Sequence, residues 1–386
     1  MADNVKIIVH RGTHQIGGIC TEIRSDKTRL IIDFGDPLEG EGRQEKLDIP
    51  GLTAAPANVD AVLFTHNHAD HIGDIMRILP DIPLYMEKTA KEISRRYYDR
   101  VKNHNDIDVS RLEAIKPLEN EKKITIGDFT ITPILSDHSA FHSLMFLLEC
   151  NGKRILYTGD YRLHGSRGAE LLAKLQEISP VDLLITDGTT LSRSNGAFLT
   201  EAQVKKMFQA VIEAKKYVFL LTSSTNIERI YNFSKSVPTG KYFLTSDFVK
   251  EILPLYGDCK ALSYGKNIAE KIENRGFGWV ITSSGQEIEP LKYYFKNHAE
   301  ETMLIYSMWR GYSKLPKVAE ILKIAGSSMM PIHSSGHVML EDFEKVVAVT
   351  KPDKIIFIHT NADVKSIDIA EKDRVVTLND GEAFDL

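Results

Sequence analysis

Cysteine is scarce in this chain, which has three cysteines among 386 residues. Cys20, Cys150 and Cys259 are odd in number, far apart and without a CxxC pair. The sequence therefore predicts neither a disulfide framework nor a cysteine zinc site, and a reducing cytoplasm fits this composition. An apolar signal region is missing from the first residues, and no apolar run reaches membrane-spanning length. We therefore expect neither secretion nor insertion into a membrane.

The chain also lacks an excess of basic residues. Lys and Arg number 48 against 53 Asp and Glu, which gives a formal net charge of -5. This balance argues against a protein that holds nucleic acid by bulk positive charge, so such binding must use a local basic groove. Residues 88–104 offer a basic stripe interleaved with Tyr97 and Tyr98. A solvated helix face, which also carries Glu92 and Asp99, is the favoured interpretation of this segment.

The length exceeds what one hydrophobic core usually fills, so two domains are expected. We find no internal repeat, low-complexity tract or Pro-rich linker. From about Ser194 the pattern changes to alternating strands and helices, which indicates βα units on a parallel sheet. We predict that this second domain is an insertion, with domain boundaries at 1–193, 194–332 and 333–386.

The most informative stretch is residues 65–74, which hold three histidines and two carboxylates directly after an apolar run. The run at 61–64 indicates a buried strand, and apolar residues recur at helical spacing from Ile72 to Leu79, so we expect the stretch to form a strand-to-helix loop. A polar surface loop is the alternative. The spacing favours a metal site, because imidazole and carboxylate are the usual ligands of zinc-like ions.

The candidate ligands of this loop fall on two faces. His66 and His68 are two residues apart and can point the same way from extended backbone, while Asp70 and His71 open the helix on a neighbouring face. One loop could therefore serve two metal ions. Further polar residues follow predicted strands: His138, Asp160, Asp187 and His359. An α/β or αββα core would gather these strand ends along one edge.

The pattern His66-x-His68-x-Asp70-His71, completed by later strand-end residues, resembles the metallo-β-lactamase superfamily. The resemblance implies an αββα sandwich and two divalent metal ions, with Zn²⁺ expected first and Mn²⁺ as the alternative. It implies a first ion held by His66, His68 and His138, a second held by Asp70, His71 and His359, and Asp160 as the bridge. Asp33 matches the family's first-motif aspartate, which supports the site without binding metal.

Three later motifs resemble those of the β-CASP nucleases, a group that includes ribonuclease J and the endonucleases of mRNA 3′-end formation. Residues 187–190, Asp-Gly-Thr-Thr, resemble motif A, His333-x-Ser335-Gly336-His337 resembles motif B, and His359-Thr360 resembles motif C. Residues 222–229 resemble the segment where the inserted domain of that group begins its second helix. The implied fold is α/β, an αββα metallo-β-lactamase sandwich with an inserted α/β β-CASP domain.

The resemblance implies hydrolysis of RNA phosphodiester bonds through a metal-bridging hydroxide, which Asp70 and Asp160 would orient. Two divalent ions carry four positive charges, and Asp70, Asp160 and the hydroxide carry three negative ones. The site would therefore keep about one positive charge, which suits an anionic substrate. The candidate substrate-binding residues are His333, Ser335, His337 and Asp187. His337 is also the candidate proton donor to the leaving oxygen, with a structural loop histidine as the alternative.

We therefore predict a cytoplasmic, metal-dependent ribonuclease that acts on single-stranded RNA, with no membrane partner and with a homo-oligomer left open. Endonucleolytic and 5′-exonucleolytic cleavage both fit the motifs. One alternative is a dinuclear metallo-hydrolase of small phosphodiesters or esters, which the short length and the acidity favour and motifs A to C oppose. A second alternative is a non-catalytic nucleic-acid-binding subunit, which the seven filled ligand positions oppose.

The chain departs from the ribonuclease J pattern in three respects. His142 stands near a position where those proteins usually carry an acidic residue, so leaving-group chemistry or specificity is expected to differ. A C-terminal domain of the kind that ribonuclease J uses in assembly is not expected after His359. The acidic net charge argues against a long RNA footprint.

Overall fold

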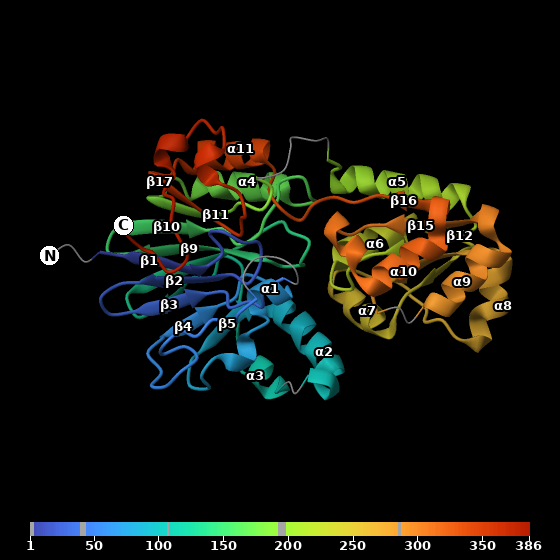
Figure 1. Cartoon of the computed structure of the whole chain (residues 1–386), viewed down its shortest axis with the longest axis horizontal. Helices are drawn as coiled ribbons and strands as arrows, with labels where there is room; N and C mark the ends of the chain where they lie inside the picture. Colours follow the sequence, from blue (N-terminus) through green and yellow to red (C-terminus); the bar gives the residue numbers. More distant parts are fainter. Residues whose placement is uncertain (1–3, 39–43, 106–107, 192–197, 285–286) are drawn as a thin grey trace. The chain divides into compact units, whose positions relative to one another are not determined.

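The computed structural model describes residues 4–38, 44–105, 108–191, 198–284 and 287–386 (Figure 1). The chain separates into two compact units. The first unit comprises Met1–Gly196 and Gly336–Leu386, and the second unit comprises Ala197–Ser335. The chain leaves the first unit once and returns to it, so the second unit is an insertion. Within the described ranges, every helix is too short or too polar to cross a membrane.

Two β-sheets form the centre of the first unit. One sheet has the order β18-β1-β2-β3-β4-β5-β6, and its strands run parallel from β3 to β6. Its strands are β1 (Lys6–Arg11), β2 (Cys20–Arg24), β3 (Arg29–Ile32), β4 (Ala61–Leu63), β5 (Leu84–Glu87), β6 (Lys116–Leu118) and β18 (Ala383–Asp385). The other sheet has the order β17-β11-β10-β9-β8-β7, in which β10, β11 and β17 are parallel. Its strands are β7 (Ile124–Ile126), β8 (Phe129–Leu135), β9 (Leu144–Cys150), β10 (Lys153–Tyr157), β11 (Leu183–Asp187) and β17 (Lys354–Ile358).

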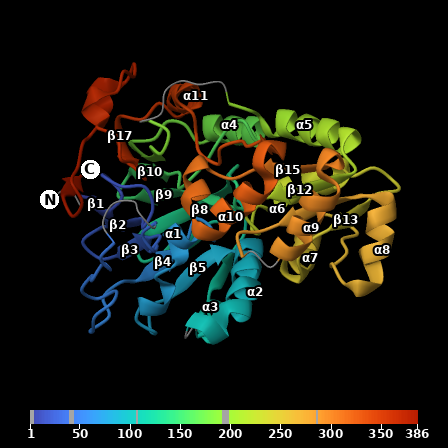
Figure 2. The same cartoon turned by 45° about the vertical axis from the view of Figure 1, so that its right-hand side comes forward.

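Helices cover the outer face of each sheet (Figures 1 and 2). Helices α1 (Ala69–Ile72), α2 (Lys88–Asn105) and α3 (Val109–Glu113) accompany the first sheet, and α4 (Gly168–Glu177) and α11 (Leu340–Thr350) accompany the second. Side chains such as Ile32 and Phe146 fill the space between the sheets. Val62 of the first sheet belongs to the core under the first helix layer, and Leu184 of the second sheet belongs to the core under the second. The β9 strand is therefore buried on both faces, which explains its nearly unbroken apolar sequence. The first unit is an αββα sandwich.

Short 3₁₀ turns complete the helical segments of the described ranges. They are η1 (Ile75–Arg77), η2 (Leu253–Leu255), η3 (Ala299–Glu301), η4 (Arg310–Lys314), η5 (Gly326–Ser328), η6 (Val364–Ser366) and η7 (Lys372–Arg374).

The second unit is built on one parallel sheet with the order β13-β14-β12-β15-β16, as the alternating pattern predicts. Its strands are β12 (Tyr217–Leu221), β13 (Tyr242–Leu244), β14 (Phe277–Ile281), β15 (Thr302–Tyr306) and β16 (Met329–Pro331). Its helices are α5 (Glu201–Ala214), α6 (Ile227–Ser236), α7 (Asp247–Ile252), α8 (Lys266–Arg275), α9 (Ile288–Asn297) and α10 (Pro316–Ala325). Phe219, Trp279 and Leu304 belong to its apolar core.

Residues near the start and near the end of the second unit are hydrogen-bonded to each other. The Ser334 hydroxyl donates a hydrogen bond to the Leu199 carbonyl oxygen at 2.7 Å. The buried Arg229 guanidinium donates to the Ser334 carbonyl oxygen at 2.9 Å, pairs with Glu201 and lies 3.0 Å from His333 Nδ1. Side chains of this unit therefore hold its first and last segments next to each other.

The helix after the histidine-rich loop is shorter than the apolar spacing predicts. It spans only Ala69–Ile72, and the 3₁₀ turn η1 follows it. The Asp74 amide donates to the Phe34 carbonyl oxygen at 3.1 Å, and the Asp70 carbonyl oxygen accepts from the Ile19 amide at 3.0 Å. These tertiary hydrogen bonds replace the helical bond between residues 74 and 70, so the helix ends after one turn.

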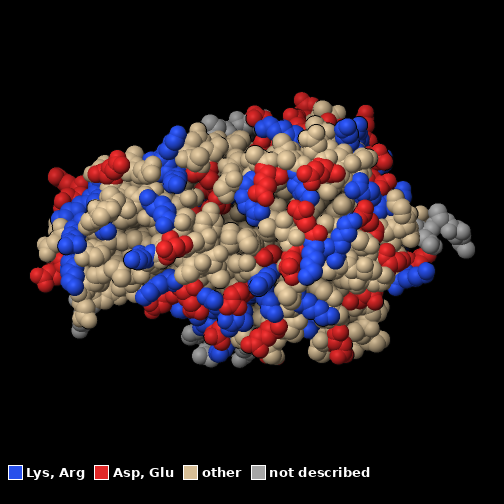
Figure 3. All heavy atoms as spheres, turned by 180° about the vertical axis from the view of Figure 1, so that it is seen from behind, with Lys and Arg blue, Asp and Glu red and all other residues tan. Residues whose placement is uncertain are grey.

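Most basic side chains of α2 are paired with nearby carboxylates or backbone carbonyl oxygens. Glu92 accepts hydrogen bonds from Arg95 and Arg96, Lys102 pairs with Asp99 at 2.7 Å, and Lys91 donates to backbone carbonyl oxygens of residues 113 and 115. Figure 3 shows basic and acidic side chains interspersed over the face that it presents. The interpretation of α2 as a solvated helix face is therefore favoured over a phosphate-binding stripe.

A buried carboxylate in the first sheet leads to a pH prediction. Glu22 Oε2 accepts from His10 Nε2 at 2.9 Å and from Arg29 Nη2 at 2.7 Å. Burial opposes ionisation, but these hydrogen bonds outweigh it and lower the pKa of Glu22 from 4.5 to about 2. Because the folded pKa lies below the unfolded one, ionised Glu22 stabilises the fold above pH 4.5, and this stabilisation is lost as the pH falls towards 2.

We expect the free energy of unfolding of Glu22→Gln to decrease less than that of the parent protein between pH 4.5 and about pH 2. Urea unfolding of both proteins at a series of pH values measures the slope. An unchanged slope would show that Glu22 is not the responsible group.

Candidate metal centre

The histidine-rich loop follows β4 and is pinned by backbone hydrogen bonds from the segment after β3. The Phe34 amide donates to the His71 carbonyl oxygen at 2.8 Å, and the Asp36 amide donates to the Ala69 carbonyl oxygen at 2.9 Å. A Cβ added to Gly35 would lie 1.8 Å from the Asp70 carbonyl oxygen. Glycine at position 35 therefore permits the close approach that fixes the loop.

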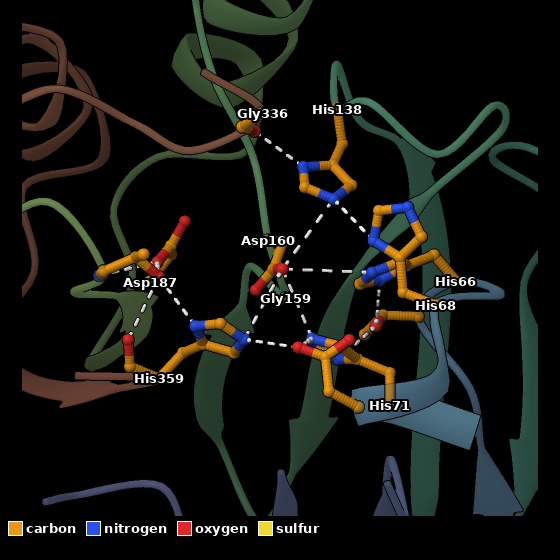
Figure 4. A network of polar contacts seen from close by, with 12 residues as sticks. His66, His68, His71, His138, Gly159, Asp160, Asp187, Gly336 and His359 are labelled. Carbon is orange, nitrogen blue, oxygen red and sulfur yellow. Dashed lines mark hydrogen bonds and ion pairs between the residues drawn. The ribbon is translucent and has the colours of Figure 1, made fainter. Parts of the chain in front are cut away.

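Three histidines of the site converge on one side of Asp160. His68 Nδ1 and His138 Nε2 are 3.3 Å apart, and Asp160 Oδ2 lies 3.7 Å from His138 Nε2 and 3.9 Å from His66 Nε2 (Figure 4). One potential ligand atom from each of these four residues lies within 4.8 Å of the others. Three imidazoles and one carboxylate at this separation match a tetrahedral donor set for a zinc-like ion.

A second group lies on the other side of the same carboxylate. His359 Nε2 is 3.1 Å from Asp70 Oδ2, and His71 Nε2 is 3.3 Å from Asp160 Oδ2. Asp70, His71 and His359 also satisfy the 4.8 Å separation. Figure 4 shows Asp160 at the centre of both groups. The structure thus brings together all seven positions predicted as ligands: His66, His68, Asp70, His71, His138, Asp160 and His359.

Asp160 and His359 each stand shortly after a buried strand. Asp160 follows β10 after Gly159, whose φ of 53° lies in the left-handed region. A Cβ at Gly159 would lie 2.8 Å from the Thr65 side chain, so the turn passes close to the histidine-rich loop. His359 follows β17 with a φ of 56°, an unusual conformation for a non-glycine residue that is often found at functional sites.

Burial sets the charge of the first group of histidines. It lowers the pKa of His66 and His138 well below the ordinary value and lowers the pKa of His68 to about 4. These imidazoles are therefore neutral near pH 7, which is the form that binds metal. In addition, His66 Nε2 is buried without a hydrogen-bond partner. Because orphaned buried nitrogens are costly, the donor set fits resident metal ions.

The carboxylates of the site are ionised. Burial opposes charge on Asp70 and Asp160, but neighbouring histidines, above all His359, hold the pKa of both groups below the usual range. Burial would likewise lower the pKa of His71, but Asp160 and Asp33 raise it instead. The first group therefore combines neutral imidazoles with the anionic Asp160, and the seven residues together are typical of a dinuclear metallo-β-lactamase site.

Residues outside the predicted ligand set orient it. Asp33, with a φ of 60°, accepts from His71 Nδ1 at 2.8 Å and from the Thr65 amide and hydroxyl, each at 2.8 Å. The Gly336 carbonyl oxygen lies 2.6 Å from His138 Nδ1. Such partners fix which ring nitrogen faces a metal. Asp33 has the supporting position that its motif predicts, whereas Thr65 and the Gly336 carbonyl group were not singled out in the sequence.

The predicted substrate-binding residues divide between the units. In the first unit, His337 Nδ1 lies 2.9 Å from Asp187 Oδ2 and 3.7 Å from Asp160 Oδ2, and its side chain is 21% exposed. His333 and Ser335 belong to the second unit, where His333 contacts Arg229. The structure thus joins Asp187 and His337 to the seven-residue cluster.

His142, whose identity departs from the ribonuclease J pattern, lies on the loop between β8 and β9. Its Nδ1 is 3.1 Å from Glu87 Oε1, and its ring packs against Phe141. Glu87 also accepts from the amides of Thr89 and Ala90, which begin α2. In the described structure, this histidine therefore contacts the start of α2.

Comparisons with known proteins agree with this fold. Residues 30–222 match the family described as "Beta-lactamase superfamily domain". A "Ribonuclease J" of Helicobacter pylori is 22% identical over 92% of this chain, and a "Probable RNase MJ4" of Methanocaldococcus jannaschii is 24% identical over 76% of each chain. The chain spans 56% of the length of the Helicobacter relative.

A solved structure from Enterococcus faecalis, described as a protein of unknown function, aligns with a TM-score of 0.77. The alignment covers 99% of this chain and 100% of that one at 17% identity, a similarity that concerns the fold. The predicted architecture, an αββα sandwich with an inserted α/β domain, is thereby confirmed. The chain belongs to the metallo-β-lactamase superfamily and has ribonuclease J proteins among its homologues over most of its length.

Proposed function

We propose that this protein is a metal-dependent ribonuclease that hydrolyses phosphodiester bonds of single-stranded RNA. The observation that carries the proposal is the Asp187–His337 pair beside a complete set of seven metal-ligand candidates. Homologues named ribonuclease J over most of the chain support RNA as the substrate. Under this proposal the second unit is the β-CASP domain, its His333 and Ser335 are candidates for contact with substrate phosphate, and so is His337, which Asp187 holds in place.

The metal ions, Zn²⁺ or Mn²⁺, would be held by His66, His68 and His138 on one side and by Asp70, His71 and His359 on the other, with Asp160 between them. Bound divalent ions would neutralise phosphoryl charge and lower the pKa of water towards neutrality. The Asp160 carboxylate faces nitrogens of both groups, so it can orient an attacking water together with Asp70. These carboxylates hold the nucleophile in place relative to phosphorus.

His337 is placed to move a proton. Its Nδ1 donates to Asp187 Oδ2 at 2.9 Å, and under this proposal Nε2 is the ring atom that acts on the substrate. Asp187 is buried and also receives two hydrogen bonds from Thr189, so its carboxylate is rigidly held. When His337 is protonated, Nε2 can donate to the leaving oxygen, and the Asp187 carboxylate stabilises the imidazolium.

The test is cleavage of 5′-labelled RNA, carrying a monophosphate or a triphosphate end, by the full chain loaded with Zn²⁺ or Mn²⁺. We expect cleavage products, whose size reports endo- or 5′-exonucleolytic action. Asp160→Ala should be inactive and serves as the control for contaminating nucleases. Hydrolysis of bis(p-nitrophenyl) phosphate without RNA cleavage would favour the small-phosphodiester hydrolase. Binding of RNA without cleavage would favour a non-catalytic subunit.

A further inference from the structure

The hydroxyl group of Thr189 lies between two groups of the site, Asp187 and His359. Thr189 Oγ1 donates to Asp187 Oδ1 at 2.6 Å and lies 2.6 Å from His359 Nδ1. The His359 carbonyl oxygen is further away, at 3.0 Å. All three residues are almost fully buried, with exposed fractions of 1% each. Sequence patterns gave this threonine no role beyond membership of the 187–190 motif.

Counting protons assigns the direction of these hydrogen bonds. A threonine hydroxyl carries one hydrogen and accepts with its lone pairs. Its contact with the Asp187 carboxylate is shorter than that with the His359 carbonyl oxygen, and a hydrogen bond to an ionised oxygen is the stronger choice. Once that hydrogen is used, Thr189 Oγ1 can only accept from His359, so Nδ1 carries the proton. The other ring nitrogen, Nε2, faces Asp70 Oδ2 at 3.1 Å and Asp160 Oδ2 at 3.8 Å.

We infer that Thr189 is the positioning residue that fixes His359 as a ligand of the second metal ion. Metal-binding histidines usually donate their second N–H to a carboxylate or a carbonyl group. Here a hydroxyl lies between the imidazole and the carboxylate. The hydrogen bonds run from the His359 imidazole to the Thr189 hydroxyl and from that hydroxyl to the Asp187 carboxylate. This pair of hydrogen bonds fixes the Nδ1–H tautomer and the ring orientation of His359, so that the Nε2 lone pair points to the ion.

Asp187 thereby serves two histidines with its two oxygens. Oδ1 accepts from Thr189 and, through it, orients His359, while Oδ2 accepts from His337. One carboxylate consequently orients both a candidate metal ligand, His359, and the candidate proton donor, His337. Replacing the Thr189 hydroxyl removes the link to His359 and one of the two hydrogen bonds to Asp187. The Thr189 amide bond to Asp187 and the contact between Asp187 and His337 remain, so the replacement acts mainly on the metal ligand.

The test is metal binding by Thr189→Val, which keeps the shape of the side chain and removes the hydroxyl. His359 Nδ1–H then loses its acceptor in a buried place, and we expect the affinity for the second ion to fall about 10–100-fold with the first ion unaffected. Titration of the metal-free full chain with Zn²⁺ against a chromophoric chelator measures both affinities. Thr189→Ser should restore the second affinity, because serine keeps the hydroxyl.

Thr186→Val is the matched control. Thr186 is also a fully buried threonine of this segment, but its hydroxyl donates to Tyr161. We expect this variant to bind both ions like the parent. If Thr189→Val does not fold, as judged by circular dichroism, Thr189→Ala is titrated in its place.

Three results would overturn the inference: unchanged binding of both ions by Thr189→Val or its Ala substitute, no recovery in Thr189→Ser, or an equal loss in Thr186→Val. The inference rests on the metal centre of the proposed function and not on RNA as the substrate. A protein that binds two ions with the expected Thr189 dependence but does not cleave RNA would refute only the ribonuclease proposal.

Discussion

His337→Ala is expected to slow single-turnover RNA cleavage on the order of 10²–10⁴-fold while two metal ions remain bound. The reason is the position of His337, which contacts Asp187 at 2.9 Å and is partly exposed, whereas the seven ligand candidates are complete without it. Removing it would take away transition-state stabilisation and leave the donor set intact. Elemental analysis and single-turnover cleavage are measured on the same preparation.

His359→Ala is the matched variant, because it removes a second histidine from the same edge of the sheet. His359 is 1% exposed and faces Asp70 and Asp160, so its loss should lower both the metal content and the cleavage rate. The group Asp160, Asp187, His337 and His359 is also close enough to share an ion. Loss of an ion from His337→Ala with both ions retained in His359→Ala would therefore reverse the two roles.

Asp137→Ala is expected to destabilise the first unit by about 3–5 kcal/mol, because it breaks a buried ion pair. Asp137 Oδ1 accepts from Arg162 Nε at 2.8 Å, and Oδ2 accepts from the Arg167 amide at 2.6 Å. Arg162 is fully buried, so the variant removes the Asp137 carboxylate from a buried guanidinium. Asp137 directly precedes His138, and the loss should also loosen that ligand.

Urea unfolding followed by far-UV circular dichroism in the presence of a chelator measures this effect without a metal contribution. Glu119→Ala provides the control, because its pair with Lys122 at 3.1 Å is exposed and is worth only about 0–1 kcal/mol. A similar small change in both variants would mean that the Asp137–Arg162 pair does not stabilise the fold.

Much of the site could be predicted because its residues follow apolar strands. His138 and His359, whose positions after strands were predicted from the sequence, follow β8 and β17 in the structure. The place of these residues after strands follows from local sequence, since a buried strand is apolar and the polar residue after it marks its end. The parallel sheet of the second unit was predictable for the same reason. The assignment of His138 and His359 as metal ligands followed from the resemblance to the metallo-β-lactamase superfamily.

Other elements were missed because tertiary contacts override the local pattern. The β2 strand, Cys20–Arg24, contains Glu22, which looks exposed in the sequence but is buried through His10 and Arg29. The same holds for α1, which tertiary backbone bonds shorten. The Thr189–His359 contact joins residues 170 positions apart, so no local spacing reveals it.

The hydrogen bond between Ser334 and Leu199 has a consequence for the origin of the two-unit chain. The second unit begins and ends at neighbouring points. The two chain ends that connect it to the sandwich are therefore already close together, as in a closed loop. The entropy of closing a flexible loop grows only with the logarithm of its length, and a self-folding insert whose termini meet removes even that cost. An ancestral sandwich could thus have acquired such a domain, or exchanged it for a few residues, without redesigning its own core.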